Sequence, residues 1–434
     1  MPALSRSALA AAALIAALGL WSDLSRFQDP LGEKYAVPVV PPGAVDFMAP
    51  FQGARALVMG VDPYRNELPE LRDPWHHEMM VEGMRTMQFY LPTHLWMYVP
   101  LVHATGGDAR AAGRIWFVIN LLILLALAVV TAGLARDALG LDSRALPALV
   151  LFCTVALALH GGSMLGLERG QSDLLTSLLC WSAVASVLRG RAALPMFLAT
   201  FAALLKGYAA VFALALLLVM GGPRMLRALA GAALALLLLL APVARYLPEA
   251  LVNVGVRMAQ QPRSVWYNVS FRSLAHAVWP GAGHELALAL VLVAIGASAC
   301  ALATLRARRE PGRALPLSMM AAATLGTVIG LSSVAHDYVL ALVLPGAILL
   351  ALAHPAVSKS PALAAAVLAS LFCLYKLYLG SSQLPLGAIG LFGLVALAGV
   401  SSIWPRSPPA PEERSRPAAS ADCPPSTPAG AAPR

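Results

Sequence analysis

The chain has 434 residues, of which 59% are hydrophobic and 12% are charged, and its mean hydropathy is +0.72. A water-soluble protein of this length cannot bury so much apolar surface, so the composition excludes that class. The formal net charge of +9 does not indicate a nucleic-acid-binding protein, because the arginines cluster in short segments between hydrophobic runs, where they set membrane orientation.

Hydrophobic runs long enough to cross about 30 Å of hydrocarbon recur along the chain. Backbone groups in lipid must hydrogen-bond within their own segment, so we expect these runs to be helices. The sequence predicts an all-α polytopic membrane protein with about twelve transmembrane helices, at 5–22, 112–135, 145–161, 173–189, 192–206, 207–221, 226–247, 286–304, 315–332, 338–354, 361–379 and 384–404.

The first hydrophobic segment, which follows Arg6, is either a cleaved signal peptide or an uncleaved signal anchor. We favour the anchor, because the run ends at Trp21, a residue typical of membrane interfaces, with no small-x-small cleavage site beside it.

Basic residues predict the orientation of the spans. A cytoplasmic N-terminus places the arginine-rich connections and Lys359 in the cytoplasm, as the positive-inside rule requires. The segment 89–102 is apolar but short and contains two prolines, and we interpret it as interfacial or re-entrant. The predicted domains are a transmembrane domain, 1–404, with external segments 22–113 and 248–285, and a disordered, Pro-rich cytoplasmic tail, 405–434.

Metal and nucleotide chemistry have little support in the sequence. The five cysteines form no Cys-x-x-Cys pair, and the adjacent His76 and His77 before Glu78 seldom converge on one ion in such an arrangement. No Walker A or GxGxxG pattern occurs. We therefore expect no metal, no cofactor and no nucleotide-binding domain.

Polar side chains gather at the predicted external ends of helices and in the external segments. They come from at least five separate parts of the chain and could line one cavity. These residues are Asp46, Asp62, Tyr64, Glu168, Arg169, Gln171, Asp173, Lys206, Asn268, His336 and Asp337.

Two segments of this set suggest acid–base and sugar chemistry. Asp46 is a candidate general base for an acceptor hydroxyl, or else a carboxylate at a helix start. In the segment LERGQSD, Arg169 could hold a phosphate oxygen and Gln171 a sugar hydroxyl. The alternative is an ordinary polar turn in which Glu168 and Arg169 neutralise each other.

The remaining candidates also have two interpretations. Lys206 could neutralise a lipid phosphate, or extend to the interface at a helix break near Gly207. His336, which precedes Asp337 and Tyr338, could contact a phosphate or play a structural part at a helix end. The aromatic residues before Asn268 could stack on a sugar or belong to the interface belt.

The order of these motifs resembles the glycosyltransferase 87 family, the polyprenyl-phosphate-mannose-dependent mannosyltransferases of the GT-C fold. The resemblance rests on a first-loop aspartate and five motifs in the family's order, and it spans roughly residues 40–345. In this chain they are Asp46, GVDPY (60–64), FYLPTHL (89–95), GQSD (170–173), LLKGY (204–208) and HDY (336–338).

The resemblance implies a glycosyltransferase of the bacterial inner membrane, with its active site facing the periplasm. Its donor would be a sugar, mannose or another hexose or pentose, on a polyprenyl phosphate, and its acceptor a glycolipid or glycan. Asp46 would be the base of a single inverting displacement. Lys206, Arg169 and His336 would bind the donor phosphate, and the substrate-binding residues would be Tyr64, Gln171, Asp173, Asn268, Asp337 and Tyr338.

The main alternative is a transporter or flippase for a lipid-linked or anionic substrate. Such a protein would place polar groups on broken helices near the bilayer midplane, whereas here they gather at helix ends beside a long external segment. A polysaccharide ligase or polymerase is a second alternative, although its large loop normally falls late in the chain. The sequence favours the transferase.

Overall fold

The computed structural model describes residues 45–65, 88, 90–260, 269–332, 337–353, 366–367, 370 and 386–403. The chain divides into Met1–Ile403 and Trp404–Arg434, and all described residues belong to the first unit. The predicted segment 5–22 and the predicted tail 405–434 lie outside the described residues, and 361–379 lies almost entirely outside them.

Helices make up the regular structure of the described residues, which confirms the all-α class there. The α-helices are α2 Val45–Val58, α4 Pro92–Thr105, α5 Ala109–Leu139, α6 Leu146–Ala158, α7 Gly161–Arg169, α8 Asp173–Leu188, α9 Ala193–Leu205, α10 Ala209–Met220, α11 Arg224–Ala235, α12 Leu247–Gln260, α13 Phe271–Val278, α14 Ala282–Arg309, α15 Ala314–Leu331, α16 Leu344–Ala353 and α18 Leu386–Ile403. The shorter elements are η3 Ser143–Ala145, η4 Leu236–Leu240, η5 Ala241–Tyr246 and η6 Asp337–Leu342.

Four helices within the described residues are long and apolar enough to cross a membrane: α5, the continuous stretch Arg224–Arg257, α14 and α15. Shorter apolar helices correspond to most of the other predicted spans, namely α6, α8, α9, α10, α16 and α18. The structure therefore supports a multi-pass membrane protein. The described residues do not establish the predicted count of twelve.

The outward faces of these helices are apolar. Leu122 on α5, Leu151 on α6, Leu226 on α11 and Leu237 on η4 are among the most exposed large hydrophobic side chains, at 61% to 77% of their accessible surface. A water-soluble monomer rarely exposes contiguous apolar surface of this extent. Lipid is the environment in which such faces are stable.

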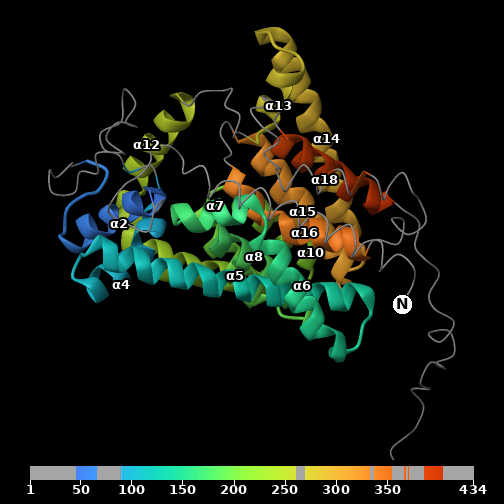
Figure 1. Ribbon diagram of the computed structural model, residues 1–434, viewed down its shortest axis with the longest axis horizontal. Coiled ribbons are helices and arrows are strands. Elements are labelled where there is room, and N and C mark those ends of the chain that lie inside the picture. The colour runs from blue at the N-terminus through green and yellow to red at the C-terminus, as the bar shows by residue number, and fades with distance from the viewer. Residues whose placement is uncertain are drawn as a thin grey trace, which may run out of the picture. The chain divides into compact units, whose positions relative to one another are not determined.

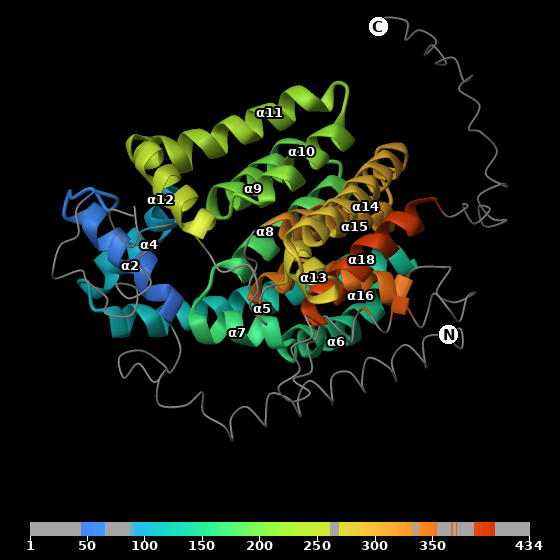
Figure 2. The same ribbon diagram turned by 90° about the horizontal axis from the view of Figure 1, so that it is seen from above.

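The helices pack closely inside the unit, as Figures 1 and 2 show from two directions. α14, α15 and α18 pack against one another, α5 packs against α6 and α8, and α9 packs against α8, α10 and α11. At the contact of α9 with α11, a Cβ atom on Gly231 would lie 2.0 Å from the backbone oxygen of Ala193. Only glycine permits this approach, as is common in membrane helix pairs.

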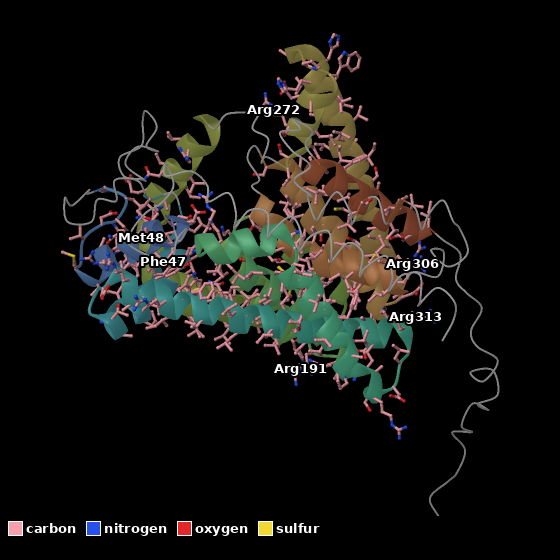
Figure 3. All side chains as sticks on the ribbon, viewed as in Figure 1. Phe47, Met48, Arg191, Arg272, Arg306 and Arg313 are labelled. Carbon is pink, nitrogen blue, oxygen red and sulfur yellow. The ribbon has the colours of Figure 1, made fainter. Side chains whose placement is uncertain are left out.

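The predicted external segment 22–113 contains α2 and α4, which pack against each other at one end of α5 (Figure 1). α2 ends at Val58, and Gly60, in a left-handed conformation (φ 73°), opens the motif GVDPY directly after it. Figure 3 shows Phe47 and Met48 of α2 at the left, and Arg306 and Arg313 of the arginine-rich connection at the right. The α2 end of α5 is therefore remote from these arginines.

The end of the span that contains α11 differs from the sequence prediction. The predicted span ended at 247, before Pro248, but the helix continues through the π-helical turn η4 and the 3-10 turn η5 to α12. Pro248 falls in the first turn of α12, where a missing N–H is tolerated. α12 thus brings the second predicted external segment, 248–285, directly out of an apolar helix.

Candidate functional site

Asp46, in the first turn of α2, is paired with Arg169, the last residue of α7. The guanidinium donates two hydrogen bonds to the carboxylate, one from Nε to Oδ2 and one from Nη2 to Oδ1 at 3.0 Å. The Asp46 side chain is 9% exposed and the Arg169 side chain 38% exposed. Asp46 is 123 residues away from Arg169 in the sequence. The side chain of Glu168, the neutralising partner that the sequence suggests, lies outside the described part of the structure.

The end of α7 is shaped by Gly170, which takes a left-handed conformation (φ 68°) as the C-cap. The Gln171 amide then donates to the Gly166 carbonyl at 2.9 Å, closing the helix end. Trp116 of α5 fixes the turn from the other side, because its Nε1 donates to the Gly170 carbonyl at 2.8 Å. This turn separates Arg169 from Gln171 and lets each side chain meet a different partner.

A second ion pair joins Asp173, the first residue of α8, to Lys206 at the end of α9. Lys206 Nζ lies 3.2 Å from Asp173 Oδ2 and donates to Gln171 Oε1 at 3.2 Å. The Tyr208 hydroxyl donates to the other Asp173 oxygen, Oδ1. Lys206 has an extended backbone (φ −137°, ψ 104°), so the predicted break near Gly207 is present, and Asp173 contacts both residues that flank that glycine.

Tyr90, just before α4, links the two ion pairs. Its side chain is buried, and it shares a hydrogen bond with the Gln171 side chain. Burial raises the pKa of Tyr90, the Asp46 carboxylate raises it further, and the Arg169 cation opposes this. Lys206 Nζ lies 5.7 Å from the centre of its ring, a cation–π distance. The neutral Tyr90 hydroxyl therefore lies within the electrostatic field of both carboxylates.

Buried aromatic side chains pack against the ring of Tyr90. The His94 ring meets the Tyr90 ring edge to face at 4.6 Å and stacks on Tyr98 at 5.7 Å. Burial lowers the pKa of His94, and the nearby Lys206 ammonium lowers it further. His94 is therefore a neutral imidazole at pH 7, and it can pack beside a lysine without charge repulsion.

Hydrogen bonds from other parts of the chain also hold the backbone at Gln88 and Tyr90. The Tyr64 hydroxyl donates to the Tyr90 carbonyl at 2.6 Å, and Asn253 of α12 donates to the Gln88 carbonyl at 3.0 Å. Arg65 and Glu249 of α12 form an exposed ion pair at 2.6 Å. The two predicted external segments thus contact each other directly.

The structure brings together most of the predicted site residues that it describes. Asp46, Arg169, Gln171, Asp173 and Lys206 form one cluster. Tyr64 is fully buried, and its hydroxyl donates a hydrogen bond to the backbone carbonyl of Tyr90. Asn268 and His336 lie outside the described residues, and only the backbone of Asp337 and Tyr338 is described, at the start of η6, which packs against α7 and α8.

Sequence reasoning missed Tyr90, His94 and Tyr208 as members of the cluster. Two of them lie in FYLPTHL, and Tyr208 ends LLKGY, so the quoted motifs held the signal. No group of three His, Cys, Asp or Glu side chains that could hold a metal ion occurs in the part of the chain that the structure describes.

The cluster combines two carboxylates with two cations at the ends of helices. A carboxylate there can accept a proton, an amide and a phenol can orient hydroxyl groups, and the cations can bind an anion. The formal charges of Asp46, Asp173, Arg169 and Lys206 sum to zero. Each cation is already paired with a carboxylate in this state of the protein.

Comparisons with known proteins identify no family for the chain. No protein-family model matches it, and no curated protein matches it. Among solved structures, it is similar to the crystal structure of ArnT from Cupriavidus metallidurans in the apo state, at 15% sequence identity and a TM-score of 0.41, covering 90% of this chain and 77% of that one.

Proposed function

We propose that the protein is a membrane glycosyltransferase that moves a sugar from a polyprenyl-phosphate donor to a glycolipid or glycan acceptor. The observation that carries the proposal is the cluster itself: Asp46, Arg169, Gln171, Asp173 and Lys206 converge from four segments at the ends of apolar helices. A donor with a lipid tail reaches such a place from the bilayer, so no soluble nucleotide-binding domain is needed.

In the proposed reaction, Asp46 takes the proton of the acceptor hydroxyl. The acceptor oxygen forms a bond to the anomeric carbon, and the bond from that carbon to the phosphate oxygen breaks. The electron pair stays with the phosphate, and polyprenyl phosphate leaves. The displacement is single and inverts the anomeric carbon. Negative charge develops on the phosphate, so cations placed there stabilise the transition state.

The two cations are proposed to bind the donor phosphate in different ways. Arg169 presents a planar guanidinium that binds two oxygens at once, and its side chain is 38% exposed. The Lys206 ammonium has three N–H donors; it donates one to Gln171 Oε1, and Asp173 Oδ2 lies 3.2 Å away as an ion-pair partner without accepting a hydrogen bond from the described residues. We propose that a remaining N–H binds a phosphate oxygen. His336 belongs to the proposal as a third phosphate ligand, through the resemblance alone.

The active site is proposed to face the periplasm of a bacterial inner membrane. The support is positional: the α2 end of the molecule is remote from Arg306 and Arg313, which mark a predicted cytoplasmic connection (Figure 3). The donor sugar is proposed to be mannose or another hexose or pentose. A transporter remains the alternative, and the site residues at helix ends favour the transferase over it.

The test is transfer by the purified protein in proteoliposomes, with a panel of polyprenyl-phosphate sugars and total lipid extract as acceptor. Asp46→Asn should lower the transfer rate by roughly 10²–10⁴-fold, the usual contribution of a general base. Glu249→Gln, which also removes a carboxylate outside the cluster, is the matched control and should retain activity. Movement of the intact lipid-linked sugar across the bilayer, without any transfer, would establish the transporter instead.

A further inference from the structure

The two ion pairs of the cluster differ in how firmly they are held. Asp173 is 1% exposed and Lys206 14%, and the same carboxylate also accepts a hydrogen bond from Tyr208. Arg169 is 38% exposed, and it reaches Asp46 from the end of a nine-residue helix. Separating the Asp173–Lys206 pair would leave a buried charge alone, which is costly. The Asp46–Arg169 pair can separate with the guanidinium still in contact with water.

An anion that binds at the cluster competes with the two carboxylates for the cations. Two carboxylates and two cations already compensate one another, so a phosphate adds uncompensated negative charge. A guanidinium binds phosphate and carboxylate by the same two-point geometry, so the two anions compete for it. Arg169 is the cation that can be exchanged at the lower cost.

We propose that the phosphate of the lipid donor takes Arg169 from Asp46, so that Asp46 is released from the guanidinium and can act as a base only after the donor has bound. This inference rests on the proposed function. Its consequence is a compulsory order, in which the donor binds before the acceptor is activated. Without a donor, the guanidinium holds both Asp46 oxygens, and neither is free to take a proton.

The transfer of Arg169 from Asp46 to the phosphate agrees with the change in charge of these two groups during the reaction. The donor phosphate is a diester with one negative charge, and the departing polyprenyl phosphate is a monoester with more. Asp46 becomes neutral as it receives the proton. The guanidinium therefore gains a stronger partner at the phosphate in the same step in which its former partner loses its charge.

The experiment is the binding of farnesyl phosphate, a short polyprenyl phosphate without sugar, to the full-length protein in detergent, measured by isothermal titration calorimetry. In the wild type, the phosphate has to displace Asp46. Asp46→Asn weakens the competing pair and should therefore tighten binding, by roughly tenfold for a partly buried ion pair. Arg169→Gln should weaken binding by a similar factor.

A double variant shows whether the gain depends on Arg169. If the two residues compete as proposed, Asp46→Asn added to Arg169→Gln should give little further tightening, and the double-mutant cycle should be clearly non-additive. Glu249→Gln removes one negative charge from the exposed pair with Arg65 and controls for a general electrostatic effect. Inorganic phosphate in place of farnesyl phosphate should show the same direction of change with lower affinity throughout.

The inference is overturned if Asp46→Asn binds farnesyl phosphate no more tightly than the wild type, or if Glu249→Gln tightens it equally. This result would leave the proposed function intact where the wild-type protein still transfers sugar. Absence of farnesyl phosphate binding in the wild type and in Asp46→Asn would overturn both the exchange and the proposed donor class.

Discussion

Asp173 at the start of α8 holds both residues that flank the break between α9 and α10. Its Oδ2 lies 3.2 Å from Lys206 Nζ, and its Oδ1 accepts a hydrogen bond from the Tyr208 hydroxyl. Because Asp173 is 1% exposed, it positions Lys206 and Tyr208 and is itself remote from solvent. The contacts of Asp173 thus position two other residues of the cluster, and its binding of substrate stays a prediction.

Asp173→Asn should destabilise the protein, because it leaves the Lys206 ammonium partly buried without its counter-ion. The expected loss is about 3 kcal/mol, as for other ion pairs broken from one side. The double variant Asp173→Asn with Lys206→Met removes both charges and should recover part of that loss. Denaturant unfolding in detergent measures both, and equal stability of the two variants would contradict an energetic link between the residues.

Tyr90→Phe should reduce sugar transfer while leaving the fold intact. The change keeps the ring under Lys206 but removes the hydroxyl that bonds to Gln171. Loss of one hydrogen bond to a polar network costs about 1–1.5 kcal/mol, or roughly tenfold in rate if it is felt in the transition state. Tyr98→Phe is the matched control, because the buried Tyr98 hydroxyl has no hydrogen-bond partner among the residues that the structure describes. Equal activities of the two variants would remove Tyr90 from the site.

Stability should fall as the pH is lowered below about 6.5, and His94 should contribute to that fall. Burial lowers its pKa from the ordinary value of 6.5, so the unfolded chain takes up a proton at a higher pH than the folded protein does. The stabilising effect is complete above pH 6.5 and is lost between that pH and the lower folded pKa. Unfolding midpoints from pH 5 to 7.5 in His94→Gln should show a shallower slope than the wild type. His103→Gln, on the same helix, is the comparison variant for the removal of a histidine, and an equal change of slope in both variants would contradict a specific contribution of His94.

Gly231→Ala should destabilise the contact of α9 with α11. The added Cβ would lie 2.0 Å from the Ala193 oxygen, and a backbone atom cannot rotate away. We expect a loss of about 1–3 kcal/mol, as for other overpacked sites. Gly133→Ala in α5 has open space at the same atom and should instead gain up to about 1 kcal/mol from helix propensity. Thermal unfolding in detergent compares the two, and identical shifts would contradict the close approach.

Much of the fold could be predicted, because hydrophobic runs specify helices directly in lipid. The end of the stretch Arg224–Arg257 could not, since Pro248 and the polar Glu249 end the apolar run while helical structure continues as α12. Polarity marks where a helix leaves the membrane, and it does not mark where the helix ends. A proline in a first helical turn is likewise compatible with continuation.

The site was predictable in its charged members and not in its pairings. Asp46, Arg169 and Lys206 stand out because ionisable residues are rare in such a sequence. That Arg169 meets Asp46 depends on the packing of α2 beside α7, which residue order alone does not give. Tyr90 and His94 were missed because buried aromatic residues in an apolar segment resemble ordinary core residues.

The stretch from Arg224 to Arg257 is helical but not straight. The π-helical turn η4 and the 3-10 turn η5 stand between α11 and α12, and α12 points away from the direction of α11 (Figure 2). Asn253 on α12 donates a hydrogen bond to the carbonyl of Gln88, two residues before Tyr90 in the chain. A movement of α12 would therefore shift the backbone beside Tyr90, which couples the cluster to the tilt of this helix in the bilayer.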